Sequence, residues 1–179
     1  AAAMLAVAPL LSRVPVDKDA ARALAMEAAD RVLWSGSEST LRHLAIDLAR
    51  ERVVRVVDWS LEDESWIFEF AEQSFGDARA GEGAWPALAI PEAQTVLRGA
   101  VDRVDVSRST APRRLRVIDY KSSSSAVKEA RRELGATMLQ VPLYALAAQR
   151  ALGHAHPSGL YVPVAELDPN FGEDAKFAK

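Results

Sequence analysis

The stretch "VIDYKSSSS", residues 117–125, raises the question on which the interpretation of this chain depends. An apolar run predicts a buried strand, and the run ends on Asp119 and Lys121, followed by four serines. One interpretation is a strand that frays into a polar loop. The other is a strand that serves as a platform for chemistry, and the rest of the chain decides between them.

The composition predicts one globular domain. The chain has 179 residues, of which 49% are hydrophobic and 26% charged, enough for a substantial core. No apolar run reaches the roughly 18 to 20 residues that span a bilayer, so no membrane partner is expected. The apolar start "AAAMLAVAPLLSRVP" lacks the basic residues of a signal peptide. The chain contains no cysteine, which excludes disulfides and thiolate metal sites and fits a cytoplasmic protein.

The charge distribution leaves two interpretations open. A net charge of −3 argues against a nucleic-acid binder, but basic residues cluster in "RRLR" at 113–116 and "KEARR" at 128–132. Both clusters flank residues 117–125. They are either solvated faces or contacts to an acidic ligand.

The residue periodicity predicts a chain of mixed helices and strands. Helices are predicted at 18–34, from Ser39 or Thr40 to about Arg55, at 125–134 and at 137–152. Strands are predicted at 65–75, 95–106, 113–121 and 159–167, with a loop between Gly76 and about residue 93. The second helix would place Leu41, Leu44 and Leu48 on one face.

The two central strand runs predict a hairpin. A turn between Thr110 and Ala111 would pair Asp102 with Asp119, Val104 with Val117 and Val106 with Leu115. Because side chains alternate along a strand, Lys121 would share the face of the two acids. The opposite face would carry Arg103, Asp105, Arg114 and Arg116.

Two opposed carboxylates and an ammonium at one end of an apolar face indicate a metal site. Opposed residues hold their Cβ atoms roughly 5 Å apart, so Asp102 and Asp119 could share one cation. Without that cation the two carboxylates would repel each other. Oxygen ligands suit Mg²⁺ or Mn²⁺, which polarise a phosphoryl oxygen and lower the pKa of a bound water. Lys121 could orient that water or neutralise charge in the transition state. The pattern favours phosphodiester hydrolysis.

Three segments together resemble a known family. "GAVDRVD", "VIDYKS" and "LQVPLY" are similar, in order and spacing, to the RecB/AddB-type nuclease domain of the PD-(D/E)XK superfamily. "EQSFG" at 72–76 resembles the segment that precedes the site in AddB-like members. The resemblance extends from about residue 66 to 164. The matching positions are Gly99, Asp102, Arg103, Asp105, Asp119, Tyr120, Lys121, Gln140 and Tyr144.

The resemblance implies an α/β fold with a restriction-endonuclease-like core, in which helices flank a mixed central sheet. Residues 1–179 would form one nuclease domain, with a helical part at 1–60 and the catalytic core at 65–165. Asp102 and Asp119 would bind the metal, and Lys121 would be catalytic. Gln140 and Tyr144, four residues apart on one helical face, would join the catalytic set. The alternative is that Tyr144 belongs to the core and Gln140 only starts a helix.

The chain departs from the family pattern in two respects. The four cysteines that hold an iron–sulfur cluster in many AddB-type members are missing, so no such cluster is expected. Many RecB-like members carry a metal-binding histidine on an upstream helix, and His43 is the candidate here, although the expected preceding glycine is absent. His43 is either a ligand or an exposed bystander. Glu72 either assists the metal or merely ends a strand.

The predicted function is a metal-dependent DNA nuclease, an exonuclease or the nuclease module of a helicase–nuclease in DNA repair and recombination. The expected phosphate contacts are Arg103, Arg113, Arg114, Arg116, Lys128, Arg131 and Arg132. No phosphate-binding loop of a motor protein occurs, so a helicase partner would lie on another segment or subunit. A first residue other than methionine fits a piece of a larger helicase–nuclease. The alternative is a catalytically silent, nuclease-like module that binds DNA or braces a repair complex.

Overall fold

The computed structural model describes residues 2–11, 17–33, 40–77, 83–109, 113–132, 139–154 and 156–167. Its helices are α1 (Ala2–Leu11), α2 (Lys18–Leu33), α3 (Thr40–Glu62), α4 (Ser124–Arg132) and α5 (Gln140–Leu152). Its strands are β1 (Trp66–Phe75), β2 (Leu88–Ile90), β3 (Thr95–Leu97), β4 (Gly99–Ser107), β5 (Leu115–Lys121) and β6 (Pro157–Pro163). A short 3₁₀ turn, Pro91–Ala93, joins β2 to β3. None of the described helices is both long and apolar enough to cross a membrane.

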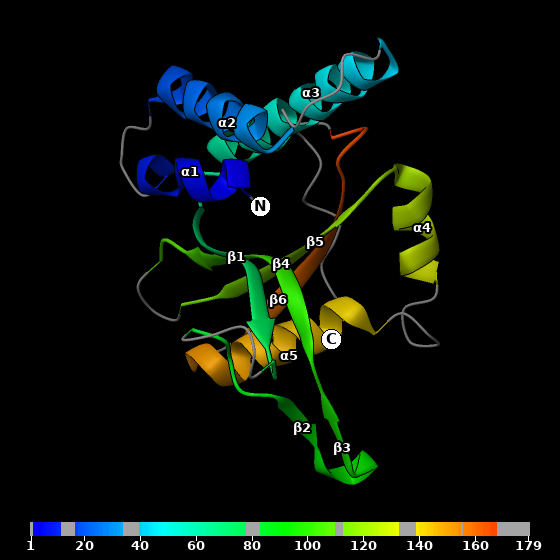
Figure 1. Ribbon diagram of the computed structural model, residues 1–179. Helices are drawn as coiled ribbons and strands as arrows, with labels where there is room; N and C mark the ends of the chain where they lie inside the picture. Colours follow the sequence, from blue (N-terminus) through cyan, green and yellow to red (C-terminus); the bar gives the residue numbers. More distant parts are fainter. Residues whose placement is uncertain are drawn as a thin grey trace.

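A mixed four-stranded sheet forms the centre of the fold, in the order β1-β4-β5-β6 (Figure 1). The pairs β1–β4 and β4–β5 are antiparallel, whereas β5 and β6 are parallel. A parallel pair needs a long crossover, and here the crossover contains α4 and α5. The predicted α/β fold, a mixed sheet flanked by helices, is therefore confirmed.

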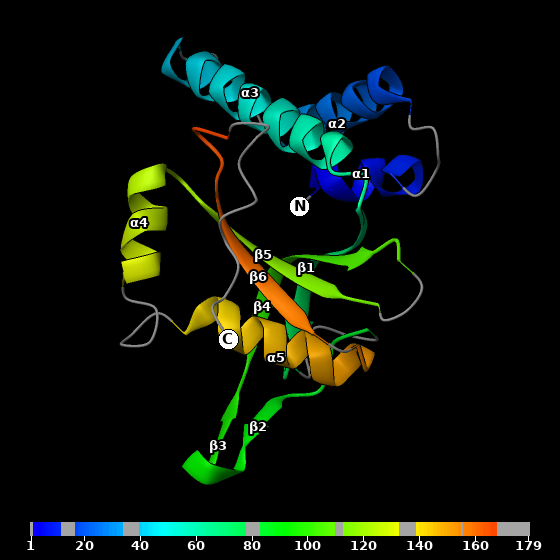
Figure 2. The same cartoon turned by 180° about the vertical axis from the view of Figure 1, so that it is seen from behind.

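Helices cover both faces of this sheet. Figures 1 and 2 show α1, α2 and α3 at one end and over one face, with α5 across the other. On the first side, Val57 and Trp59 of α3 pack with Phe68 and Ile118. On the second, Val141 and Ala148 of α5 pack with strand residues that include Val104 and Val117. Because both faces are covered, β5 is buried along most of its length.

The predicted register of the central hairpin is confirmed from Arg103 to Val106. Val104 pairs with Val117, and Val106 pairs with Leu115. These four valine and leucine side chains all belong to the cluster beneath α5. The regular ladder between β4 and β5 ends at the pair Arg103–Ile118, one residue short of Asp102 and Asp119.

The structure corrects the predicted extent of the second helix. It was expected to end near Arg55, but α3 continues to Glu62. The β-branched run of this segment has weak helix propensity, yet Val56, Val57, Trp59 and Leu61 are buried, and this packing outweighs the propensity. Leu44 and Leu48 are exposed instead of facing the core. The side chain of Leu41 lies outside the described residues.

The segment between β1 and β4 is also more ordered than predicted. Part of the expected loop forms β2 and the 3₁₀ turn, and the expected strand at 95–106 is interrupted at Arg98. The hairpin of β2 and β3 extends from the body at the end opposite α1–α3 (Figures 1 and 2). Its base is fixed to β1, because Gly76 N donates to Trp85 O at 2.9 Å. Gly76 has φ +70°, and a Cβ there would lie 2.9 Å from the Ala87 Cβ, so glycine is required.

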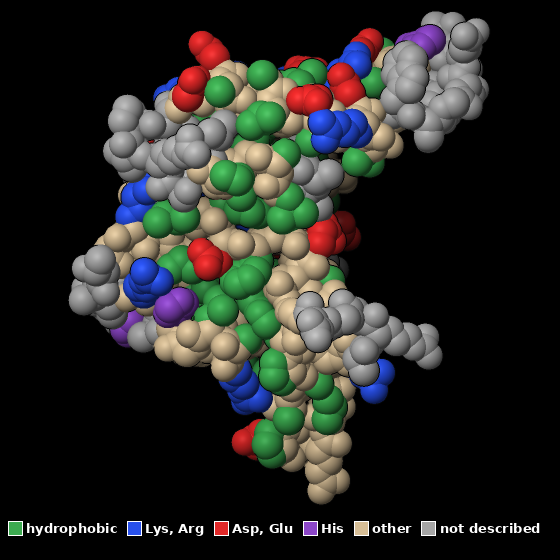
Figure 3. All heavy atoms as spheres, turned by 60° about the vertical axis from the view of Figure 1, so that its left-hand side comes forward, with side chains coloured by type: hydrophobic (Ala, Val, Ile, Leu, Met, Phe, Trp, Pro, Cys, Tyr) green, Lys and Arg blue, Asp and Glu red, His purple; other side chains and the backbone are tan. Residues whose placement is uncertain are grey.

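Ion pairs fasten α2 to α3. Arg22 Nε lies 2.6 Å from Asp58 Oδ1, and Arg50 Nε lies 2.6 Å from Asp30 Oδ1. Figure 3 accordingly shows acidic and basic side chains close together over the helical end of the molecule. These charges are partly exposed and contribute little to stability individually.

Candidate active site

Asp119 and Lys121 lie at the end of β5 and project from the same face of the strand. Asp119 is only 3% exposed, and its Oδ2 lies 2.6 Å from Lys121 Nζ. Among the described residues, this buried oxygen has no polar partner other than Lys121. Burial raises the pKa of Asp119; the Lys121 ammonium opposes this shift, and the charge of Asp102 adds to it.

Asp102 reaches the same place from β4. Its Oδ2 accepts a hydrogen bond from the backbone N–H of Tyr120 at 2.9 Å. The carboxylate thus takes the place of a backbone carbonyl just where the β4–β5 ladder ends. This bond holds Asp102 beside the segment that carries Asp119 and Lys121.

The sheet is irregular at Asp102. Ala71 pairs with Arg103 and Gln73 with Val101, so Glu72 lies opposite Asp102 on β1. Glu72 has φ +52°, a left-handed conformation that costs a non-glycine residue about 1–3 kcal/mol. Val101 and Val104, three residues apart, both lie in the cluster beneath α5, so the alternation of faces shifts at this point. Glu72 itself is exposed.

A chain of hydrogen bonds continues from Lys121 into α5. Lys121 Nζ donates to Gln140 Oε1 at 3.2 Å, and Gln140 Nε2 donates to Tyr144 Oη at 3.0 Å. The Tyr144 ring packs edge-on against Phe75 with centroids 6.0 Å apart. Gly99 lies against both rings, and a Cβ at this position would lie 3.0 Å from the Phe75 ring and 3.5 Å from the Tyr144 ring. The two α5 residues singled out in the sequence therefore lie together beside Lys121.

Tyr161 is a neighbour of the site that the sequence analysis missed. It lies on β6 directly across the parallel ladder from Asp119, and it is 3% exposed. Its ring centroid lies 5.4 Å from Lys121 Nζ. The alternation of "GLYV" indicates a strand, but a parallel register cannot be read from it.

The remaining residues of the family motif form a network on the other face of the sheet. Arg103 Nε donates to Asp105 Oδ1 at 2.7 Å, and Arg116 Nη2 donates to Asp105 Oδ2 at 2.7 Å. Arg103 also donates to Ser60 Oγ at 2.6 Å and to Tyr120 Oη at 3.3 Å. Arg116 donates to Asp63 Oδ2 at 2.6 Å. The motif therefore places Asp102, Asp119 and Lys121 together at one site and Arg103 and Asp105 in an ion-pair network on the other face of the sheet.

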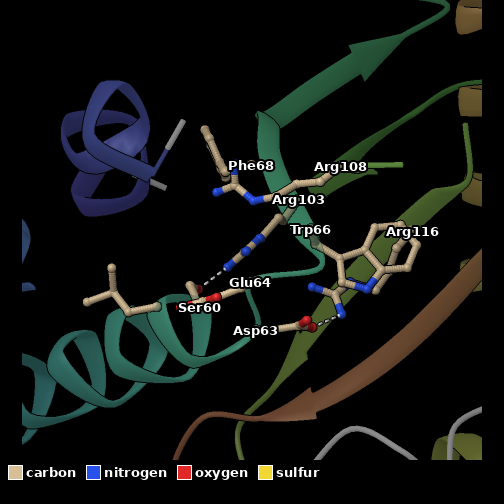
Figure 4. Close-up of a pocket in the computed structure, with 9 residues that line it drawn as sticks. Ser60, Asp63, Glu64, Trp66, Phe68, Arg103, Arg108 and Arg116 are labelled. Atoms are coloured by element: carbon tan, nitrogen blue, oxygen red, sulfur yellow. Dashed lines mark hydrogen bonds and ion pairs between the residues drawn. The ribbon is translucent and has the colours of Figure 1, made fainter. Parts of the chain in front are cut away.

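A small pocket opens over this network, between the end of α3 and β1 (Figure 4). Its lining includes Ser60, Asp63, Trp66, Arg103 and Arg116. Trp66 lies against the Arg116 guanidinium at 4.5 Å, and Trp59 lies 5.4 Å from that of Arg103. The charges are thus paired and stacked, which is how a protein stabilises buried guanidinium groups.

The predicted DNA contacts divide into buried and exposed side chains. Arg103 and Arg116 are 2% and 6% exposed and already paired, so they are not available to DNA phosphates in this structure. Arg113, Arg114 and Lys128 are exposed. The side chains of Arg131 and Arg132 lie outside the described residues. Arg114 and Lys121 are separated by the length of β5, about 23 Å for seven residues, so the two predicted basic groups flank opposite ends of the strand.

The metal ligands proposed from the sequence differ in their placement. Asp102 and Asp119 lie at the ladder end described above, and Glu72 is opposite Asp102. His43 is exposed on the first turns of α3, which extend away from the sheet in both ribbon views (Figures 1 and 2). Within the part of the chain that is described, no three acidic or histidine side chains form a metal cluster. The two carboxylates still fit a hard divalent cation, because Lys121 is the only polar partner of Asp119 Oδ2 among the described residues.

A mixed sheet whose two central strands bring two acids and a lysine to one place defines the class of this protein, an α/β fold with a carboxylate–lysine centre. The chain matches the model of the PD-(D/E)XK nuclease superfamily over residues 3–177 and belongs to that superfamily. No curated protein sequence matches it. The fold is accordingly restriction-endonuclease-like, and members of the superfamily typically use divalent metals such as Mg²⁺.

Proposed function

We propose that the chain is a metal-dependent DNA nuclease of the RecB/AddB type, most simply an exonuclease in DNA repair or recombination. The observation that carries this proposal is the contact between Lys121 and Asp119 at 2.6 Å, beside Asp102. Superfamily membership supports the reaction class. The order of the three motif segments supports the RecB/AddB type.

In this proposal Asp102 and Asp119 hold Mg²⁺ or Mn²⁺. The bound ion would polarise a phosphoryl oxygen and make its water a better nucleophile. Burial makes the negative charge of Asp119 unfavourable and Lys121 offsets only part of this cost, so a cation at this carboxylate would relieve the remainder. Glu72, across from Asp102, and His43 are further ligand candidates from the sequence.

Lys121 supplies positive charge where the phosphodiester gains negative charge. Gln140 restricts the ammonium by accepting one of its hydrogen bonds, and Tyr144 accepts from the amide nitrogen of Gln140. The amide is oriented by these two bonds, its oxygen toward Lys121. A flexible lysine is thereby held in one place, which lowers the entropy lost in the transition state.

The direct test is digestion of end-labelled linear and circular DNA with Mg²⁺, with Mn²⁺ and with EDTA. We expect metal-dependent release of label from linear DNA only, and none from Lys121→Ala. Cleavage of circular DNA would show that the protein is an endonuclease and not an exonuclease. Equal cleavage in EDTA would exclude the metal-dependent reaction.

A silent DNA-binding module is the second candidate. One observation favours this silent module: the described residues supply no cluster of three metal ligands. The same assay separates the two: a silent module would retard linear DNA in a gel and cut none of it. Against the silent module stands the repulsion between the half-buried Asp102 and the buried Asp119, which a scaffold does not need.

We further propose that residues 1–179 act as one nuclease domain of a larger cytoplasmic helicase–nuclease. DNA and a helicase domain or subunit are then its partners. Co-purification of the chain with a motor protein from its native source, dependent on neither DNA nor metal, would support this assignment. Failure to recover any motor protein under those conditions would count against it.

A further inference from the structure

Tyr161 forms one wall around the Lys121 ammonium. The ammonium contacts Asp119 Oδ2 at 2.6 Å, Gln140 Oε1 at 3.2 Å and the ring of Tyr161 at 5.4 Å from its centroid. Two of these walls are polar acceptors from β5 and α5. The third is an aromatic ring from β6, placed there by the parallel pairing of Tyr161 with Asp119.

The ring, rather than the hydroxyl, makes the contact. The Tyr161 hydroxyl is buried and lies beside the backbone of Val141 on α5. The hydroxyl therefore faces α5, and the ring is the part of Tyr161 that contacts the ammonium. The aromatic face, by contrast, attracts a cation within about 6 Å, and more strongly where water is excluded.

An aromatic wall has a use that a third acceptor would lack. A metal ion bound by Asp119 competes with Lys121 for the same carboxylate, so the ion pair alone cannot hold the ammonium in the loaded site. Neither the ring of Tyr161 nor the amide of Gln140 carries a charge for which the ion must compete. These two contacts can keep Lys121 near the reacting phosphate while the carboxylate serves the metal.

We propose that Tyr161 is a positioning residue that holds the ammonium of Lys121 at the site through a cation–π contact. This proposal rests on the proposed function, in which Lys121 is catalytic. It also predicts that phenylalanine, but no aliphatic residue, can replace Tyr161.

The first test needs no activity. Unfolding by urea in EDTA is compared for wild type, Tyr161→Leu, Lys121→Met and the double variant. A cation–π contact predicts that the two substitutions are non-additive by about three- to thirtyfold in the unfolding constant. The matched control pairs Tyr161→Leu with Lys128→Met, an exposed lysine of α4, and should be additive. Additivity in both pairs would overturn the contact.

The second test keeps the shape of the ring constant, because Tyr161→Leu leaves a cavity and can fail to fold. Position 161 is occupied by phenylalanine and then by mono-, di- and trifluorophenylalanine, which weaken the negative face of the ring stepwise. We expect kcat to fall stepwise, by about tenfold over the series, whereas KM for DNA and the Mn²⁺ half-saturation stay constant. A purely structural ring would give a flat series, which would overturn the positioning role.

The two tests separate this inference from the proposed function. If the substitutions are coupled in EDTA but wild type does not cleave DNA, the Lys121–Tyr161 contact is supported and the nuclease assignment is excluded. If wild type cleaves DNA, but the substitutions are additive and the fluorinated series is flat, the nuclease assignment holds and the positioning role of Tyr161 is excluded.

Discussion

Lys121 and Asp119, two residues apart on β5, approach to 2.6 Å between Nζ and Oδ2, and each also faces a neighbouring strand or helix. Asp119 is buried at its position opposite Tyr161 of β6, whereas Lys121 retains limited contact with solvent. The burial raises the pKa of the acid, and the ammonium counters only part of that shift. The pair is therefore held at an electrostatic cost that a metal-dependent reaction would explain.

Lys121→Ala should abolish DNA cleavage and leave metal binding largely intact. The ammonium stabilises charge in the transition state, and loss of one such group typically lowers kcat about 10²–10³-fold. Cleavage of end-labelled DNA measures kcat, and calorimetric titration with Mn²⁺ measures metal affinity. Lys18→Ala, at an exposed position of α2, is the control and should change neither. Wild-type turnover by Lys121→Ala would show that Lys121 is not catalytic.

Asp119→Asn should be as stable as wild type, or more stable, in EDTA at neutral pH. The folded-state pKa of Asp119 is raised, mainly by burial, so ionisation of this acid destabilises the metal-free fold. That penalty is fully present above the folded pKa and is relieved as the pH falls through it. The advantage of the asparagine variant should therefore shrink on acidification, as measured by urea unfolding from neutral pH downward.

Mn²⁺ should reverse the order of the same two proteins. Wild type gains about 2.7 kcal/mol at one hundred times Kd, because the metal binds only the folded state. The asparagine variant lacks one ligand charge and should gain far less. Thermal melts with EDTA and with Mn²⁺ measure both shifts. Equal metal-induced shifts would show that Asp119 is not a ligand.

Neutralising Arg113, Arg114 and Lys128 together should weaken DNA binding and flatten its salt dependence. Each lost phosphate contact removes about 0.9 unit from the slope of log K against log salt. Because the arginines and Lys128 flank opposite ends of β5, the two groups should contribute separately. Fluorescence anisotropy over a salt series, for each group and for the triple variant, measures this. An unchanged slope would assign all three charges to a solvated surface.

The hairpin and its polar end could be predicted from sequence because local rules determine them. The alternation around Val104 and Val117, with a turn assumed between residues 110 and 111, predicts the register that the structure has from Arg103 to Val106. That register brings Asp102 and Asp119 to adjacent strands. Gln140 and Tyr144 could be grouped because residues four apart share a helical face.

What could not be predicted depends on contacts distant in sequence. Arg103 and Arg116 were placed on the correct face of the hairpin, but the cover of that face was not foreseen. The helix expected to end near Arg55 continues past Trp59 and Ser60, and these residues bury the arginines. Tyr161 was missed for a related reason: its pairing with Asp119 is parallel and is set by α5 packing rather than by a turn.

In the buried ion-pair network of Arg103, Asp105 and Arg116, neutralising one residue should destabilise the fold more than replacing an oppositely charged pair. Asp105 is fully buried between the Arg103 and Arg116 guanidinium groups at 2.7 Å from each. Asp105→Asn leaves two buried cations with one counterion, Asp63, at the pocket edge, and should cost about 3–5 kcal/mol. The double variant Arg103→Met, Asp105→Leu removes a charge of each sign and should recover part of that loss. Urea unfolding measures all of them, with Asp19→Asn, at the exposed start of α2, as a neutral control. If Asp105→Asn unfolds at the wild-type midpoint, the network does not hold α3 to the sheet, and the motif residues Arg103 and Asp105 need another explanation.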